Sequence, residues 1–267
     1  MAIGFLGAGK MAEALLSSMV QDELCEPWEI AVCDISEERR NWMAERYEVA
    51  VTDDAAEVVE DCDMLVVAVK PQDINVLLTG IKDQLDEEHL VISIAAGKTL
   101  AALQGVIGTK PRLVRVMPNL ALSVGEGMSV FCAAENVTPD DKEAVMQLLG
   151  MAGAVLELPE QHFDAVTALS GSGPAFVAYV LQAMIKAAVA LDLPEEEARL
   201  LAEQTLIGTA VYLQNTGSDI GKFIQAVASP KGTTAAGLAV LEASDVNTVI
   251  SQTLAAAAAR SRELSKA

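Results

Sequence analysis

The sequence predicts an α/β fold: a parallel, doubly wound sheet over residues 1–159, followed by an all-helical region over residues 160–267. Three observations carry this prediction. Short continuous apolar runs alternate with amphipathic stretches in the first part, as expected of strands covered on both faces by helices. After about residue 159 these runs stop, and long stretches rich in Ala, Leu and Val replace them. A Gly-x-Gly-x-x-Ala segment stands between the first apolar run and the first helical pattern.

The strands are predicted from the apolar runs, because fully buried parallel strands lack polar alternation. They are expected at residues 2–6, 30–33, 49–51, 64–69, 90–94, 113–117, 128–131 and 154–158. Helical patterns lie between them, for example over 10–20, 37–46 and 73–85. Thr138 followed by Pro139 is typical of an N-cap with proline at the first helical position, and that helix is expected to end at Gly150.

The second part of the chain is predicted to be helical throughout. The expected helices cover 174–191, 194–213, 220–228, 237–243 and 245–266. These segments carry few charges and are apolar nearly all round, which is typical of buried helices. About a hundred residues cannot bury that much apolar surface alone, so we expect a second subunit to cover it.

Composition excludes several classes of function. The chain has 18 Lys and Arg against 38 Asp and Glu, a formal charge of −20. Such a charge argues against nucleic-acid binding and against adsorption to anionic membranes. The most apolar stretch, 165–191, is interrupted by Ser, Gly and Pro, so no membrane span is expected. The N-terminus has no signal-peptide pattern, and the four scattered cysteines fit reduced thiols rather than disulfides or a metal site, so we expect a cytoplasmic protein.

The glycine-rich segment Gly7-Ala8-Gly9-Lys10-Met11-Ala12 predicts a dinucleotide-binding site over residues 1–159. Gly7 allows a tight turn, Gly9 lets a pyrophosphate approach the backbone, and Ala12 lets the helix pack closely on the strand. Asp34 ends the second predicted strand, where a carboxylate usually accepts hydrogen bonds from the ribose of NAD. Arg39 and Arg40 follow and could instead reach a 2′-phosphate, so these residues leave the choice between NADH and NADPH open.

Two Gly/Ser/Thr clusters interrupt the helical part, over residues 167–176 and 229–238. The second has several hydroxyls and backbone amides before a new helix, which suits a small carboxylate. A plain connection between helices is an equally good interpretation of either cluster. Lys70, at the end of the fourth strand, is more simply a surface or phosphate-contacting lysine than a catalytic base.

Six motifs together resemble the pyrroline-5-carboxylate reductase family. They are GAGKMA at 7–12, AVKPQ at 68–72, SIAAG at 93–97, RVMPN at 115–119, ALSGSGPAF at 168–176 and SPKGTTAAGL at 229–238. The resemblance implies reduction of 1-pyrroline-5-carboxylate to L-proline, the last step of proline biosynthesis, using NADPH, with NADH possible. It also implies a Rossmann domain followed by a helical dimerisation and substrate-binding domain (160–267), a homodimer and, in some members, a decamer.

Carried over residue by residue, the resemblance implies two sets of contacts. Cofactor contacts fall on Leu6, Gly7, Ala8, Gly9, Lys10, Met11, Asp34, Ala68, Val69, Lys70, Pro71, Ala95, Gly97 and Asn119. Substrate contacts fall on Glu160, Ser229, Gly232, Thr233 and Thr234, with the Thr234 hydroxyl near the imine nitrogen as the catalytic group.

Two residues depart from the family pattern. Lys231 stands where the family usually has glycine; because lysine rarely adopts a positive φ, we expect the loop to differ locally, or Lys231 to add a cation near the substrate carboxylate. Asp34 replaces the small hydroxyl or amide often found at the position that selects NADPH.

Three alternative functions stay open from the residues alone. A β-hydroxyacid dehydrogenase shares the two-domain plan but needs a lysine shortly after its glycine-rich turn, whereas here the first lysine after Gly173 is Lys186. A reductase of another cyclic imine would use the same parts. An NAD(P) sensor without turnover would not need the cluster at 229–238.

Overall fold

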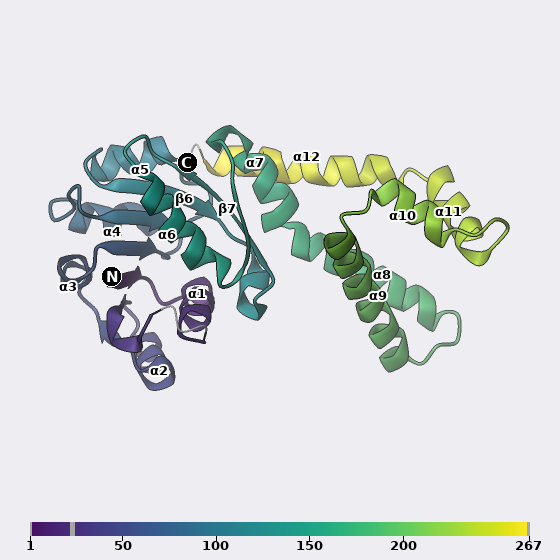
Figure 1. Ribbon diagram of the computed structural model, residues 1–267, viewed down its shortest axis with the longest axis horizontal. Coiled ribbons are helices and arrows are strands. Elements are labelled where there is room, and N and C mark those ends of the chain that lie inside the picture. The colour runs from purple at the N-terminus through teal and green to yellow at the C-terminus, as the bar shows by residue number, and fades with distance from the viewer. Residues whose placement is uncertain (1, 22–24, 266–267) are drawn as a thin grey trace. The chain divides into compact units, whose positions relative to one another are not determined.

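The computed structural model describes residues 2–21 and 25–265, and these form two compact units (Figure 1). The first unit contains the described residues up to Ser172 together with those from Ala257 onward. The second contains Gly173–Ala256. The predicted division at 159/160 instead marks where strands give way to helices.

The described part of the first unit contains an eight-stranded sheet in the order β3-β2-β1-β4-β5-β6-β7-β8. The strands are β1 (Ile3–Leu6), β2 (Ile30–Cys33), β3 (Ala50–Thr52), β4 (Met64–Val67), β5 (Leu90–Ser93), β6 (Arg112–Met117), β7 (Gly127–Ala133) and β8 (Gly153–Glu157). Each overlaps a predicted strand. All four residues of β1, β4 and β5 are buried, as the continuous apolar runs indicated.

The sheet is mostly parallel, as predicted, with one antiparallel pairing near its end. Strands β1 to β6 pair in parallel, but β7 runs antiparallel to β6, and β8 is parallel to β7. The reason is the length of the connection. The segment between Met117 and Gly127 holds only the short 3₁₀ helix η2 (Leu120–Val124), whereas a parallel crossover needs a dozen or more residues.

Helices cover both faces of the sheet in two sets (Figure 1). The chain moves outward from β1 to β3 and then back across to β4, β5 and β6. Right-handed crossovers therefore place the helices of these two paths on opposite faces. One set is α1 (Lys10–Gln21), α2 (Glu37–Tyr47) and α6 (Pro139–Gly150); the other is α3 (Ala55–Asp61), α4 (Ile74–Ile81) and α5 (Leu100–Ile107).

Side-chain caps fix where these helices begin. The Ser36 side chain accepts from the Arg39 amide, and Thr99 accepts from Ala102. Thr138 and Asp141 form a capping box with Pro139 at the first helical position, which confirms the predicted start of α6; the helix ends at Gly150 as expected.

The second unit is helical. It contains α8 (Gly173–Val189), α9 (Glu195–Thr216), α10 (Ile220–Val227), α11 (Thr233–Ala243) and the first part of α12 (Val246–Leu264). The helices α8, α10 and α11 have no buried residue. Large apolar side chains are exposed instead, among them Val177, Tyr179, Val180, Met184, Leu200, Leu201, Ile207, Tyr212 and Ile224. The apolar faces predicted from the sequence are therefore present and uncovered within one chain.

The first Gly/Ser/Thr cluster does not interrupt the helical path. It forms the π-helical turn η4 (Thr167–Gly171), which follows α7 (Phe163–Val166) and leads into α8. The Ser172 amide donates to the Thr167 carbonyl at 2.8 Å, and the Thr167 hydroxyl donates to the Phe163 carbonyl at 2.8 Å. Within the described residues one segment, Glu160–Val189, is long and apolar enough to cross a membrane, although Ser170, Ser172 and Pro174 lie in it.

Candidate functional site

The carboxyl ends of five parallel strands meet at one edge of the sheet. Leu6 at the end of β1 pairs with Cys33 of β2 and Val67 of β4, and Val67 pairs with Ser93 of β5. The chain order reverses between β1 and β4, and ligands of such sheets bind beside that reversal, at the carboxyl edge. The structure thus brings the predicted cofactor residues after β1, β2, β4, β5 and β6 to a common edge.

The glycine-rich loop has the geometry that its sequence predicts. Gly7 has φ +108°, and a Cβ there would lie 2.9 Å from the backbone of Ala68 and Val69, so only glycine fits. Gly9 is exposed, with open space where a Cβ would be. The first backbone amides of α1 have no acceptor inside the helix, and Ala12 is fully buried against the core. This loop fits the pyrophosphate of a dinucleotide.

Asp34 fastens this loop to the end of β2. Its Oδ2 accepts from the Ala8 amide at 2.7 Å and its Oδ1 from the Ser36 amide at 2.8 Å. Arg39 lies beside it and donates through Nε to the Ala8 carbonyl at 2.8 Å. Asp34 therefore stands where the ribose of a bound dinucleotide belongs.

The remaining cofactor candidates line the same edge. Lys70 and Pro71 are exposed, Ala68 and Val69 are half-buried, and Ala95 is buried. Gly97 has φ +76°, and a Cβ there would meet Leu264 of α12 at 3.4 Å. Small side chains at these strand ends leave room for a flat ring against the backbone.

Asn119 has a structural task in addition to its predicted cofactor contact. Its Oδ1 accepts from the amides of Ala121 and Met128, each at 3.2 Å, and its Nδ2 donates to the Ser170 carbonyl at 3.2 Å. It thus joins the turn after β6 to the π-helical turn. One N–H of its side-chain amide is left for a ligand.

Glu160 forms a partly buried cluster that the motifs did not predict. Its Oε1 accepts from Arg115 at 2.8 Å and from the Leu100 amide at 2.7 Å. The Arg115 side chain is 5% exposed, and its guanidinium carbon lies 4.5 Å from the centre of the Phe163 ring. A signal was present in the sequence, because Arg115 is a charge inside an apolar strand and such a charge requires a partner.

The second Gly/Ser/Thr cluster lies in the second unit and begins a helix. The Gly232 amide donates to the Ser229 carbonyl at 3.0 Å, and α11 starts at Thr233, earlier than the predicted residue 237. Ser229, Gly232, Thr233 and Thr234 are therefore together at the N-terminus of α11, where backbone amides lack intrahelical acceptors. The expectation that Lys231 would avoid a positive φ is wrong, because its φ is +60°. The tight Ser229–Gly232 turn imposes this conformation on the residue before Gly232.

Three of the cysteines are unsuited to nucleophilic chemistry. Burial, followed by neighbouring carboxylates, raises the pKa of Cys33 and of Cys62 to about 11. Burial and the Glu160 carboxylate raise the pKa of Cys132 to about 12. Protonated buried thiols are inert. Among the described residues, no group of three or more His, Cys, Asp and Glu side chains could hold a metal ion.

Both parts of the chain match known protein families. Residues 160–264 match the family model "Pyrroline-5-carboxylate reductase dimerisation", and residues 2–97 match "NADP oxidoreductase coenzyme F420-dependent". The pyrroline-5-carboxylate reductase of Methanosarcina acetivorans is 37% identical over 264 residues, which are 99% of this chain and 98% of the relative. The chain belongs to the pyrroline-5-carboxylate reductase family.

Solved structures of reductases share the whole architecture. One from Coxiella burnetii has a TM-score of 0.95 at 34% identity and covers 99% of this chain and 98% of its own. One from Plasmodium falciparum, solved with NADP bound, has a TM-score of 0.88 at 28% identity and covers 99% of this chain and 98% of its own. The resemblance of the motifs is thus confirmed over the full length of the reductase, and a hydroxyacid dehydrogenase is not favoured.

Proposed function

We propose that the edge formed by the strand ends holds the dinucleotide, and the Ser229–Thr234 loop the substrate, during reduction of 1-pyrroline-5-carboxylate to L-proline. The chain is an NAD(P)H-dependent oxidoreductase of this specificity. The cofactor assignment rests on the loop at Gly7–Gly9. Only glycine fits at residue 7, and the open space at Gly9 lets a ligand approach the backbone.

The cofactor, when bound, supplies the hydride that the imine carbon accepts. The protein has to bind, orient and shield the reactants. The free amides at the start of α1 hold the pyrophosphate. The small residues after β4 and β5, with Asn119 after β6, bound the place of the nicotinamide ring.

The substrate carboxylate is assigned to the N-terminus of α11. The amides of Thr233 and Thr234 and the hydroxyl of Ser229 are hydrogen-bond donors for it there. The Thr234 hydroxyl is assigned to the ring nitrogen. A protonated imine is already electrophilic, so the loop needs no strong acid.

Glu160 is assigned to the substrate through its second oxygen, Oε2, because both hydrogen bonds described above go to Oε1. This gives Glu160 two tasks, one at the ion pair with Arg115 and one at the substrate.

The test of the function is oxidation of NADH and NADPH with and without 1-pyrroline-5-carboxylate. Substrate-dependent oxidation supports it, whereas nucleotide binding without turnover on this substrate refutes it. Thr234→Ala should lower kcat while the cofactor Kd stays unchanged, and Thr234→Ser, which keeps the hydroxyl, should retain most of the activity. An unchanged kcat in Thr234→Ala would remove this hydroxyl from the reaction.

The helical region forms an oligomer, as its match to a dimerisation family indicates. We propose specifically a homodimer, further assembly of such dimers to a decamer, and a cytoplasmic location without nucleic-acid or membrane partners. The exposed apolar side chains of α8, α9 and α10 support the dimer, since another copy would cover them. Light scattering on the purified protein tests it: a mass of one chain contradicts the dimer, and two or ten chains fit the two expected assemblies.

A further inference from the structure

We infer that the ribose end of the cofactor site discriminates against a 2′-phosphate, so that the protein binds NADH more tightly than NADPH. This rests on the proposed cofactor site but goes beyond it, because the function requires only NAD(P)H. The first observation is the fixed position of Asp34. Both of its carboxylate oxygens accept backbone hydrogen bonds, from Ala8 at 2.7 Å and from Ser36 at 2.8 Å. The carboxylate cannot turn away from a ligand without releasing the glycine-rich loop.

The second observation is that both neighbouring arginines already have partners. Arg39 donates from Nε to the Ala8 carbonyl at 2.8 Å and from a terminal nitrogen to Glu13 at 2.7 Å. Arg40 donates to the Asp34 carbonyl at 2.8 Å and lies 3.6 Å from the Asp53 carboxylate. Each guanidinium is thus already paired with a carboxylate, and a phosphate would have to compete with that carboxylate.

Glu13 forms the ion pair that holds Arg39 in place. Its carboxylate also accepts from the Trp42 indole at 2.7 Å and from the Tyr47 hydroxyl at 3.3 Å. Burial opposes ionisation of Glu13, but the hydrogen bonds from Trp42, Arg39 and Tyr47 outweigh it and hold its pKa below the ordinary value. Glu13 therefore stays charged, and Arg39 stays neutralised by it.

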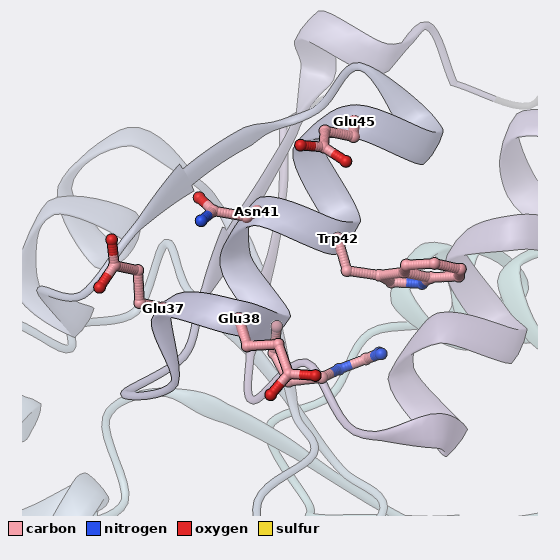
Figure 2. A pocket seen from close by; sticks show the side chains of 6 residues that line it. Glu37, Glu38, Asn41, Trp42 and Glu45 are labelled. Carbon is pink, nitrogen blue, oxygen red and sulfur yellow. The ribbon is translucent and has the colours of Figure 1, made fainter.

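The charges of this network sum to −1, because Glu13, Asp34 and Asp53 oppose Arg39 and Arg40. Figure 2 shows three more carboxylates, Glu37, Glu38 and Glu45, along the adjoining groove on α2. A 2′-phosphate would bring up to two further negative charges to this place. A 2′-hydroxyl can instead donate a hydrogen bond to Asp34.

The experiment is a fluorescence titration of the full-length protein with NADH and with NADPH, at low salt, without substrate. We expect the Kd of NADPH to exceed that of NADH by on the order of tenfold to a hundredfold. Asp34→Asn removes the charge and should reduce this ratio by at least tenfold. Glu13→Gln releases Arg39 and should also tighten NADPH, with little effect on NADH. Glu87→Gln, exposed in the turn before β5 at the opposite end of the strands, removes the same charge and should leave the ratio unchanged.

Equal or tighter binding of NADPH by the unaltered protein overturns the inference, and so does a ratio that neither Asp34→Asn nor Glu13→Gln changes. An equal reduction in Glu87→Gln also overturns it, because overall charge would then explain the preference. Equal binding together with turnover leaves the proposed function intact. Failure to bind either nucleotide refutes both.

Discussion

Replacing Arg115 by Met should destabilise the first unit substantially. The Arg115 side chain is 5% exposed, donates to Glu160 at 2.8 Å and lies against the buried ring of Phe163. Met keeps much of the aliphatic length but has no charge and no donor. The substitution therefore leaves the Glu160 carboxylate with the Leu100 amide as its remaining hydrogen-bond donor in the cluster.

The magnitude follows from these contacts. Breaking a buried ion pair by removing one partner costs about 3–5 kcal/mol, and the cation–π contact adds roughly 0.5–2 kcal/mol. The Glu160 side chain is 30% exposed, so water recovers part of its solvation. We expect a net loss of about 2–4 kcal/mol in the free energy of unfolding, which lowers Tm by roughly 5–15 °C for a chain of this length.

The assay is urea unfolding followed by circular dichroism, at one fixed protein concentration because assembly contributes to stability. Glu160→Gln is the matched variant. It keeps an oxygen for both donors and should cost less than about 1.5 kcal/mol. The double variant Arg115→Met with Glu160→Gln should recover part of the loss, because no unpaired charge remains. If Arg115→Met unfolds at the same urea concentration as the unaltered protein, the ion pair does not stabilise the fold and the reasoning fails.

Three further predictions concern the backbone, the thiols and the overall charge. Gly153 has φ +138°, and a Cβ there would collide with the backbone of Gly127. Gly153→Ala should therefore lower the free energy of unfolding by about 3 kcal/mol or more. Gly150→Ala, with open space around it, should change the urea midpoint little. The pKa values of Cys33, Cys62 and Cys132 are raised in the folded protein, so the unfolded chain loses these thiol protons at a lower pH. The free energy of unfolding should therefore fall as the pH rises from about 9 through 11 to 12. A urea midpoint that rises from pH 8 to pH 10 would contradict this. The charge of −20 opposes the approach of two anionic ligands, so KM for the substrate should fall on moderate addition of salt, and a steep rise would refute the role of the field.

The positions of the elements were predictable because their signals are local. Continuous apolar runs mark the buried strands, and Thr138 followed by Pro139 marks the start of α6. The glycine requirement in this loop was also predictable from the local Gly-x-Gly-x-x-Ala spacing, although the atoms that exclude a Cβ at Gly7 belong to the distant residues Ala68 and Val69.

Features that depend on distant partners were not predictable. The direction of β7 is set by its connection and by pairing with β6, and an apolar run contains neither. The π-helical turn depends on Asn119 and on the close approach of Met117 to Gly171. The positive φ of Lys231 runs against its intrinsic preference and is imposed by the surrounding turn.

The reversal of direction at β7 has a practical consequence for protein engineering. The end of β7 lies beside the beginning of β6, since Ala133 pairs with Val114, so the turn at 134–138 is at the sheet edge opposite the cofactor residues. Asn136 braces this turn by donating to the carbonyls of Thr109, Lys110 and Pro111, each at 3.2 Å, while Glu135 is exposed. A fluorophore or surface tether attached at residue 135 would therefore report on the molecule, or immobilise it, without obstructing the edge proposed for the dinucleotide.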